Sequence, residues 1–321
     1  MITMSRCLFS FSLCLLKTEN IRFEKGYGMD ISKVMKELED KKLILGDNQK
    51  CKPLTGGTVS EIYLLSIENG SDFVIKSNKP DIVKSEAEFL DLYRDIPLLP
   101  ELIYTDPTNK YIIYTYIPGA TVNVSTPNKK EILQAMVVDL LNNYKTVSST
   151  EGWGWRDSPI NSWGNFLLTE VRRSSEVLTD HLLKVDVELV MALTMRAGRY
   201  ESLGDPFLIH GDCGIHNFIM EDGRLSGVID PAPVYGPPLY DLIYAFCSSP
   251  ADLTKETLDS AASLLVVQPI DKKWLYEEVA IVLYLRLATC LKHHPADFAS
   301  YLAAWNYWKN IINPHFRNQF Y

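Results

Sequence analysis

Short apolar runs separated by turn residues predict a strand-rich first part of the chain, from about residue 52 to about residue 116. The runs with strand character are 58–67 (TVSEIYLLSI), 72–76 (DFVIK) and 111–116 (YIIYTY). The second run follows Asn69-Gly70, a pair that favours a tight hairpin turn. Residues 85–93 have helical periodicity instead. We therefore expect a small antiparallel sheet accompanied by a helix.

The apolar spacing becomes helical after Pro118-Gly119. The helices predicted from it are 129–147, 165–183, 185–200, 254–267 and 273–292. A β-rich segment at 207–231 interrupts them. The whole pattern predicts an α+β protein with a small antiparallel β N-lobe at 29–117 and a larger, mainly helical C-lobe at 118–321.

The first 28 residues show no part of this pattern. Residues 7–16 (CLFSFSLCLL) resemble the start of a secretion signal, but the run is too short to span a membrane and no small-residue cleavage site follows it. An amphipathic helix begins near Asp30, with Asp30 or Ser32 as its cap, so Met29 is an alternative start. We expect residues 1–28 to be a leader that is either disordered or extraneous.

The composition is that of a folded globular protein. Of the 321 residues, 46% are hydrophobic and 22% are charged. A net charge of −8 gives no sign of the basic face that nucleic-acid binders use, and no apolar run elsewhere reaches the roughly 18 residues of a membrane helix. The six cysteines are scattered without a C-x-x-C pair, as in a reduced, cytoplasmic protein.

The motif that carries chemistry lies in the β-rich segment, at 208–220 (LIHGDCGIHNFIM). His210, Asp212 and Asn217 have the kinase catalytic-loop spacing H-x-D-x-x-x-x-N. In that arrangement the aspartate accepts the proton of an attacking hydroxyl, and the asparagine reaches a Mg²⁺ that bridges the nucleotide phosphates. His216, inside the loop, is expected to be structural.

A second carboxylate follows at the end of an apolar strand, 225–231 (LSGVIDP). Asp230 in this position suits a second Mg²⁺ ligand, because oxygen donors are preferred by this hard cation. An isolated H-G-D would usually be a turn, and a lone strand-end aspartate would usually be a helix cap. Together, and after a separate β-rich lobe, they favour phosphoryl transfer.

These motifs resemble the aminoglycoside phosphotransferase superfamily, which includes choline, fructosamine and homoserine kinases. The matching residues are His210, Gly211, Asp212, Asn217, Ile229, Asp230, Gly236, Asp241 and Leu242. The resemblance implies a two-lobed protein-kinase-like fold, Mg²⁺, and ATP or GTP as co-substrate. It also implies that Asp212 is the catalytic base, that Asn217 and Asp230 hold metal, and that His210 and Asp241 support the catalytic loop.

The N-lobe shows the same resemblance over 54–65 (LTGGTVSEIYLL), where the family has its nucleotide loop. It implies nucleotide contacts from Gly56, Gly57 and Ser60, although the glycine pair departs from G-x-G-x-x-G and is weak when taken alone. No Walker A sequence is present, which argues against a P-loop enzyme.

Lys76 resembles the lysine that binds the α- and β-phosphates, and Glu86 fits its partner, with Glu88 as a competitor. The segment 114–119 (YTYIPG) resembles the family's hinge, in which backbone groups of Thr115 and Ile117 would bind the purine.

We therefore predict a small-molecule kinase that transfers a γ-phosphoryl group to a hydroxyl of an acceptor such as an aminoglycoside-like antibiotic or an amino alcohol. The alternative is a catalytically weak nucleotide-binding regulator with the same fold. A protein kinase is disfavoured because the D-F-G and A-P-E signatures are absent. The sequence leaves open the acceptor, the choice of ATP or GTP, and the oligomeric state.

Two interpretations of the segment before the catalytic loop remain open. Trp153, Trp155 and Trp163 either line an acceptor pocket or belong to the core. Asp157 and Glu170 either hold a cationic acceptor or are ordinary surface charges. Outside this segment, the aromatic stripe at 301–308 and His293-His294-Pro295 are expected to be helix packing and a helix end.

Overall fold

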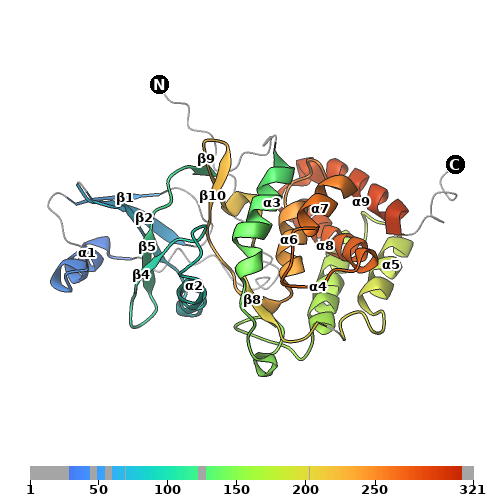
Figure 1. The fold of residues 1–321 in the computed structure, drawn as a ribbon, viewed down its shortest axis with the longest axis horizontal. Helices are drawn as coiled ribbons and strands as arrows, with labels where there is room; N and C mark the ends of the chain where they lie inside the picture. Colours follow the sequence, from blue (N-terminus) through green and yellow to red (C-terminus); the bar gives the residue numbers. More distant parts are fainter. Residues whose placement is uncertain are drawn as a thin grey trace. The chain divides into compact units, whose positions relative to one another are not determined.

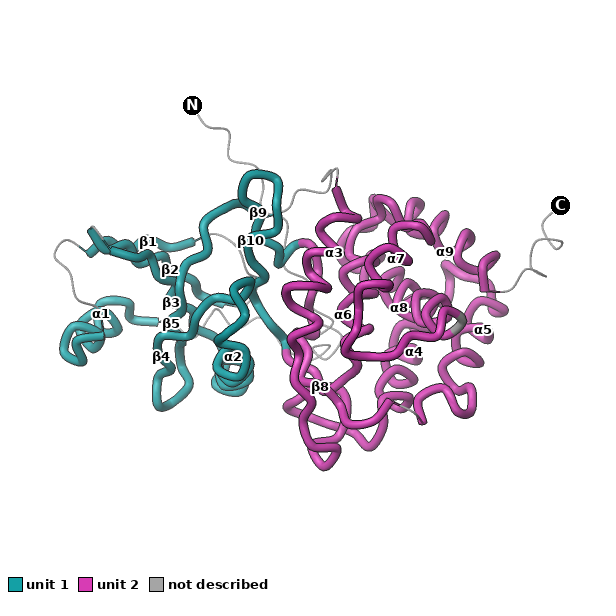
Figure 2. Tube along the Cα trace, viewed as in Figure 1, with its two compact units in different colours: residues 1–121, 216–232 teal, residues 122–215, 233–321 magenta. Residues whose placement is uncertain are grey.

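The computed structural model describes residues 29–43, 49–54, 60–68, 70–121, 128–201 and 203–312. The predicted leader at 1–28 and the Gly56-Gly57 pair lie outside the described residues. The chain divides into two compact units (Figure 2). Unit 1 contains the described residues up to Thr121 together with His216–Ala232, and unit 2 contains the rest.

Unit 1 is built on a five-stranded antiparallel sheet with the order β1-β2-β3-β5-β4. Its strands are β1 (Lys50–Pro53), β2 (Glu61–Ser66), β3 (Phe73–Ser77), β4 (Leu102–Thr105) and β5 (Tyr111–Thr115). In the central pair, Ile75 lies opposite Ile113, and Lys76 lies opposite Ile112. Because side chains alternate along a strand, these two pairs face opposite sides of the sheet.

Two helices pack on the two opposite faces of this sheet (Figure 1). Helix α1 (Ile31–Asp40) buries Val34 and Leu38 in a cluster with Ile75 and Ile113. Helix α2 (Pro80–Leu92) packs on β4 and β5 and carries Glu86 to the Lys76 side. Asp30 caps α1 by accepting a hydrogen bond from the Lys33 N–H, as one of the two predicted caps.

A second sheet in unit 1 comes from a distant part of the chain. It has the order β10-β9-β6, formed by β6 (Ala120–Thr121), β9 (Phe218–Glu221) and β10 (Arg224–Val228). Asp222 and Gly223 join β9 to β10 with φ of 49° and 77°. Two consecutive left-handed residues make a tight hairpin turn, for which Asp-Gly is a favoured pair.

Unit 2 is mainly helical, with one small antiparallel sheet. Its helices are α3 (Lys129–Asp139), α4 (Trp163–Leu178), α5 (Lys184–Thr194), α6 (Pro238–Cys247), α7 (Lys255–Ala262), α8 (Lys272–His293) and α9 (Phe298–Ile312). The sheet has the order β7-β11-β8, from Gly154–Trp155, Val234–Gly236 and Phe207–Ile209. Short 3₁₀ turns lie at Leu141–Asn143, Ser149–Glu151, Ile215–Asn217 and Pro295–Asp297.

Helix α8 runs through the centre of unit 2, and α4, α6 and α9 pack against it. Every residue of α6 is buried, which explains its nearly continuous apolar sequence. Trp305 and Trp308 of α9 are also buried, so the C-terminal aromatic stripe is helix packing as predicted. Likewise, α8 ends at His293.

The predicted fold class is confirmed, whereas some predicted helix ends are wrong. The helix expected at 129–147 ends at Asp139. Further along, the Val147 N–H bonds to the Pro206 carbonyl and the Leu208 N–H bonds to the Lys145 carbonyl. These long-range bonds hold the segment extended beside β8, so tertiary pairing overrides the local helical pattern.

Within the described part of the chain, no helix is long and apolar enough to cross a bilayer. The four cysteines found there, Cys51, Cys213, Cys247 and Cys290, are free thiols.

Candidate active site

Lys76 is the centre of a charged cluster in unit 1. It lies on β3, is 5% exposed, and places Nζ 2.7 Å from Glu86 Oε2 and 2.9 Å from Asp230 Oδ1. Asp230 follows Lys76 by 154 positions in the chain. The fold therefore brings together three of the residues that the sequence singled out.

The electrostatics of this cluster keep Lys76 charged. Burial lowers the pKa of its ammonium group, but the negative charges of Asp230 and Glu86 outweigh burial and raise the pKa above the ordinary value. Two carboxylates share one ammonium group, so a further cation would be favoured beside Asp230.

Asp230 has an unusual backbone conformation. Its φ is 58°, in the left-handed region that a non-glycine residue seldom adopts. Its side chain stays 21% exposed although its neighbour in the ion pair is buried. The Ile229 N–H donates to the Asn217 carbonyl at 2.9 Å, which fixes the two predicted metal-binding segments to each other.

The expected purine-binding segment follows β5. The Thr115 N–H already donates to the Glu101 carbonyl, and the Tyr116 N–H donates to the Asp72 carbonyl. The structure shows no hydrogen bond of the Ile117 backbone within the described residues. Ser60, the other predicted nucleotide residue described here, accepts a hydrogen bond from Asn78 Nδ2 at 2.8 Å.

Unit 2 holds the catalytic loop by its backbone. The buried carboxylate of Asp241 accepts hydrogen bonds from the His210 N–H at 2.8 Å, the Gly211 N–H at 3.0 Å and the Tyr144 hydroxyl at 2.8 Å. Burial raises the pKa of Asp241 to about 7, and these donors oppose the rise. Gly211 has φ of 77°, a conformation that suits glycine at this turn.

Asp212 is held by the same helix. The Tyr244 hydroxyl donates to Asp212 Oδ1 at 2.7 Å, and Asp212 is 2% exposed. Tyr244 lies three residues after Asp241 on α6, so both side chains lie on one side of that helix. Sequence reasoning missed Tyr144 and Tyr244; for Tyr244 the i+3 spacing from Asp241 was the available signal.

The chain passes from unit 2 to unit 1 within the catalytic loop. On the unit 2 side, the Ile215 N–H donates to Ser248 Oγ at 3.0 Å. On the unit 1 side, Asn217 is buried and its carbonyl accepts the bond from Ile229. Asp212 and Asn217 are thus anchored to different units although only a few residues separate them.

A comparison with protein families identifies the family that has this set of residues. Residues 50–270 match APH, described as the phosphotransferase enzyme family. The chain belongs to this family. The match covers both the Lys76 cluster of unit 1 and the Asp212 loop of unit 2, and it establishes the chain as a phosphotransferase.

Solved structures share the fold of this phosphotransferase at low sequence identity. Macrolide 2'-phosphotransferase MphH from Brachybacterium faecium is 17% identical, with a TM-score of 0.54 over 88% of this chain and 98% of that one. APH(2")-IIia in complex with GDP and kanamycin is 16% identical, with a TM-score of 0.57 over 90% and 100% of the two chains. APH(2")-IIa in a ternary complex with streptomycin and ATP is 18% identical, with a TM-score of 0.55 over 88% and 97%. No curated protein matches the sequence.

The tryptophans of the phosphotransferase favour one of the two interpretations left open by the sequence. Trp155 and Trp163 are buried, and the Trp163 ring packs against Phe166 and Tyr240. These two are core residues, whereas Trp153 is half-buried. Of the two acidic candidates for acceptor binding, Glu170 is buried and pairs with Arg173 of its own helix at 2.9 Å. Asp157 is exposed.

The donor atoms in unit 1 fit Mg²⁺. No group of three or more acidic, histidine or cysteine side chains that could hold a metal occurs among the described residues. Mg²⁺ does not require one, because it usually takes one or two protein oxygens and fills its shell with water and substrate phosphates. The carboxylate of Asp230 and the amide oxygen of Asn217 supply donors of that kind.

Proposed function

We propose that this phosphotransferase transfers the γ-phosphoryl group of ATP or GTP to a hydroxyl of a small acceptor. The observation that carries the proposal is the buried Lys76, bridged to Glu86 and Asp230 in a member of the phosphotransferase family. A buried ammonium group held in this way is ready to receive phosphate oxygens, since its position is already fixed.

The residues of unit 1 bind the nucleotide in this proposal. Lys76 binds the α- and β-phosphates, and Glu86 holds it in place. Backbone groups of Thr115 and Ile117 bind the purine. Asn217 and Asp230 hold Mg²⁺, which neutralises charge on the phosphates when it is bound.

The residues of unit 2 act on the acceptor. Asp212 accepts the proton of the acceptor hydroxyl, whose oxygen forms a bond to the γ-phosphorus while the bond to the bridging β–γ oxygen breaks and the nucleoside diphosphate leaves. Tyr244 orients the Asp212 carboxylate through their 2.7 Å hydrogen bond. His210 and Asp241 hold the loop.

The acceptor is a small molecule of the aminoglycoside or amino alcohol kind. Kanamycin and streptomycin in two structures with the same fold support an aminated, hydroxyl-rich acceptor. The net charge of −8 favours a cationic one. A purely regulatory nucleotide binder is disfavoured, because Lys76, Asp212, Asn217 and Asp230 are all retained.

Nucleotide binding and turnover test the proposal together. ATP and GTP are titrated by calorimetry with and without Mg²⁺, and each is then incubated with aminoglycosides, macrolides, choline, sugars and amino alcohols while phosphorylated product is followed by mass spectrometry. Lys76→Met is expected to weaken nucleotide binding at least tenfold, while Lys84→Met, an exposed lysine on α2, leaves it unchanged. Equal nucleotide affinity in the two variants would contradict the role of Lys76.

A further inference from the structure

Helix α6 holds the catalytic loop with three side chains on one side of the helix. Asp241 and Tyr244 bind the start of the loop, at residues 210–212. Ser248, at the C-terminal end of the helix, accepts a hydrogen bond from the Ile215 N–H at 3.0 Å. These three positions have the i, i+3, i+7 spacing of one helix face. The helix therefore contacts the loop from residue 210 to residue 215.

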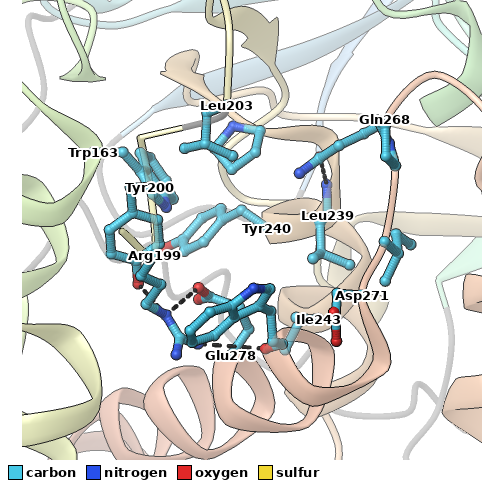
Figure 3. Close-up of a pocket in the computed structure, with 14 residues that line it drawn as sticks. Trp163, Arg199, Tyr200, Leu203, Leu239, Tyr240, Ile243, Gln268, Asp271 and Glu278 are labelled. Atoms are coloured by element: carbon cyan, nitrogen blue, oxygen red, sulfur yellow. Dashed lines mark hydrogen bonds and ion pairs between the residues drawn. The ribbon is translucent and has the colours of Figure 1, made fainter. Parts of the chain in front are cut away.

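The opposite side of α6 has different neighbours. Leu239 and Ile243, which are four residues apart, line a cavity in unit 2 (Figure 3). The lining of this cavity does not include Asp241, Tyr244 or Ser248. The side chains that bind the catalytic loop are thus confined to one side of the helix.

The hydroxyl of Ser248 is fixed in direction. It donates to the Ala245 carbonyl of its own helix at 2.7 Å. Because its one proton is used in that bond, a lone pair is left to accept the Ile215 N–H. Ser248 is buried, so its side chain is also held by packing.

Two cations hold the end of the helix that carries Ser248. Arg286 Nη2 donates to the Ser248 carbonyl at 3.1 Å, and Lys129 Nζ donates to the Ser249 carbonyl at 3.1 Å. Positive groups are favourable here, because the carbonyl groups at the C-terminal end of a helix carry partial negative charge. Arg286 is fixed in turn by the bond from its Nε to the Tyr301 hydroxyl at 3.0 Å. Helices α8 and α9 therefore stabilise the position of Ser248.

Ile215 begins the turn that carries Asn217. This 3₁₀ turn runs from Ile215 to Asn217, and the first N–H groups of a helical turn have no partner inside the turn. Ser248 supplies the acceptor for Ile215, and at the other end the Asn217 carbonyl accepts the Ile229 N–H. Of these two bonds, the one to Ser248 involves a side chain, so a substitution can remove it.

From these contacts, we propose that Ser248 is a positioning residue for magnesium binding. By accepting the Ile215 N–H, its hydroxyl fixes the turn from which Asn217 presents its amide oxygen to Mg²⁺. Ser248 acts through the backbone of the loop and is not itself a ligand. The inference rests on the proposed function, in which Asn217 holds the metal.

The effect of Mg²⁺ on nucleotide affinity tests this role. The Kd of ATP or GTP, whichever binds more tightly, is measured by calorimetry with and without Mg²⁺. In the wild type, Mg²⁺ is expected to tighten nucleotide binding. Ser248→Ala is expected to keep the Kd measured without Mg²⁺ and to lose about fivefold of the tightening, the usual effect of one hydrogen bond. Unchanged tightening overturns the proposal.

Hydrogen exchange gives a second measurement that needs neither metal nor nucleotide. In Ser248→Ala, the amide of Ile215 is expected to exchange about fivefold faster than in the wild type, because its acceptor is lost. An unchanged exchange rate would show that the Ser248 hydroxyl does not hold the turn, and the proposal would be wrong.

Ser249→Ala is the matched control. Ser249 is buried at the same helix end, but its hydroxyl accepts the Ala251 N–H at 3.2 Å instead of a group of the catalytic loop. This variant is expected to keep the wild-type response to Mg²⁺ and the wild-type exchange of Ile215. Equal losses in Ser249→Ala and Ser248→Ala would indicate a general loosening of α6 and overturn the proposal. Ser248→Cys has nearly the same size and only a weak acceptor, so it carries the test if Ser248→Ala does not fold.

Asn217→Ala separates a failure of this inference from a failure of the proposed function. It removes the proposed ligand and is expected to lose more of the tightening by Mg²⁺ than Ser248→Ala does. If Asn217→Ala loses the tightening and Ser248→Ala keeps it, only the role of Ser248 is wrong. If Asn217→Ala keeps it, the metal role proposed for Asn217 is wrong, and the inference about Ser248 fails with it.

Discussion

Asp212 is nearly inaccessible in unit 2, and one of its carboxylate oxygens is taken by Tyr244. Asp212→Asn keeps the shape and an oxygen for that bond but cannot accept a proton. We expect kcat to fall by about 10²–10⁴-fold, the usual scale for a lost general base, with little change in nucleotide affinity. Steady-state kinetics with the acceptor found by screening check this.

The control for this variant is Asp139→Asn, an exposed aspartate at the end of α3. It is expected to keep wild-type kcat. Near-normal turnover in Asp212→Asn would remove Asp212 from the mechanism.

Lys129 is a buried residue with a pH-dependent effect on stability. Its Nζ donates to the Ser249 and Ala251 carbonyls, and burial lowers its pKa to about 8. Its charged neighbours are Asp252 and Arg286, and the nearby Cys247 thiol has a pKa raised to about 12 by burial.

The unfolded chain holds the Lys129 proton up to about pH 10.5. Between pH 8 and 10.5 it therefore binds more protons than the folded chain. Because of this difference, the free energy of unfolding rises with pH through that window. Lys129→Met should remove this trend. We expect the wild-type-minus-variant difference in unfolding free energy to grow by up to about 3 kcal/mol across the window, at about 1.4 kcal/mol per pKa unit. Urea titrations at several pH values measure it, and a constant difference would contradict it.

Single residues differ in how far the sequence could predict them. Asp212, Asn217 and Asp230 follow from motif spacing, because neighbouring positions on one loop and strand are fixed locally. Tyr144 has no such signal: it precedes Asp241 by 97 positions, and only the folded chain brings their side chains together.

At the scale of elements, α9 is tied to α5 by one buried carboxylate. Asp186 Oδ1 accepts hydrogen bonds from Lys309 Nζ at 2.6 Å and Trp305 Nε1 at 3.2 Å. Asp186→Ala leaves a buried ammonium group unpaired. We expect the unfolding free energy to fall by about 3–5 kcal/mol, measured by urea denaturation.

A matched control lies on the same helix. Glu188 of α5 pairs with Lys184 at 3.5 Å, and both side chains are largely exposed. Glu188→Ala is expected to change the unfolding free energy by less than about 1 kcal/mol. Equal effects of the two variants would show that Asp186 does not anchor α9.

The predicted helices and the strands β2, β3 and β5 exist, whereas several helix ends and the strands β1 and β4 were not predicted. Each predicted helix has a counterpart, since the apolar spacing of its buried face is local. The segment 185–200 illustrates the limit: α5 stops at Thr194, and the residues beyond it carry Arg199 to Glu277 and Glu278. Those pairs join positions about 80 residues apart, so no local pattern reports them.

At the scale of the whole molecule, we expect a chain that starts at Met29 to fold like the full chain. Helix α1 begins at Ile31, and Glu37 accepts hydrogen bonds from the Tyr104 and Tyr111 hydroxyls, so the described core of unit 1 is complete from Met29. The melting temperature should change by no more than about 2 °C, since a loss of 1 kcal/mol already shifts it by about that much in a chain of this size.

The control for that shortened chain is one that starts after Asp40. It also loses the buried Val34 and Leu38, each worth about 1.5–3 kcal/mol of burial. Its melting temperature should drop clearly. Calorimetry on the three chains distinguishes these outcomes. A large drop in the melting temperature of the chain that starts at Met29 would show that residues 1–28 stabilise the fold.

The interleaving of the two units could not be predicted from the sequence. The pattern gave a boundary at 117 between an N-lobe and a C-lobe, and that boundary remains a prediction. What it could not show is that β9, far along the chain, pairs with β6 in unit 1. Strand pairing over such a distance depends on the rest of the fold and leaves no periodicity in either segment.

The composition of unit 1 from two separated stretches has a consequence for synthesis on the ribosome. Asp230 follows Lys76 by 154 residues, which take roughly 8–30 s to add at 5–20 residues per second. Residues 122–215, which belong to unit 2, are made during that interval. A nascent chain that stalls before residue 216 therefore carries strand β6 without β9, and Lys76 without its second carboxylate. Translation therefore completes residues 122–215 of unit 2 before it adds His216–Ala232 of unit 1.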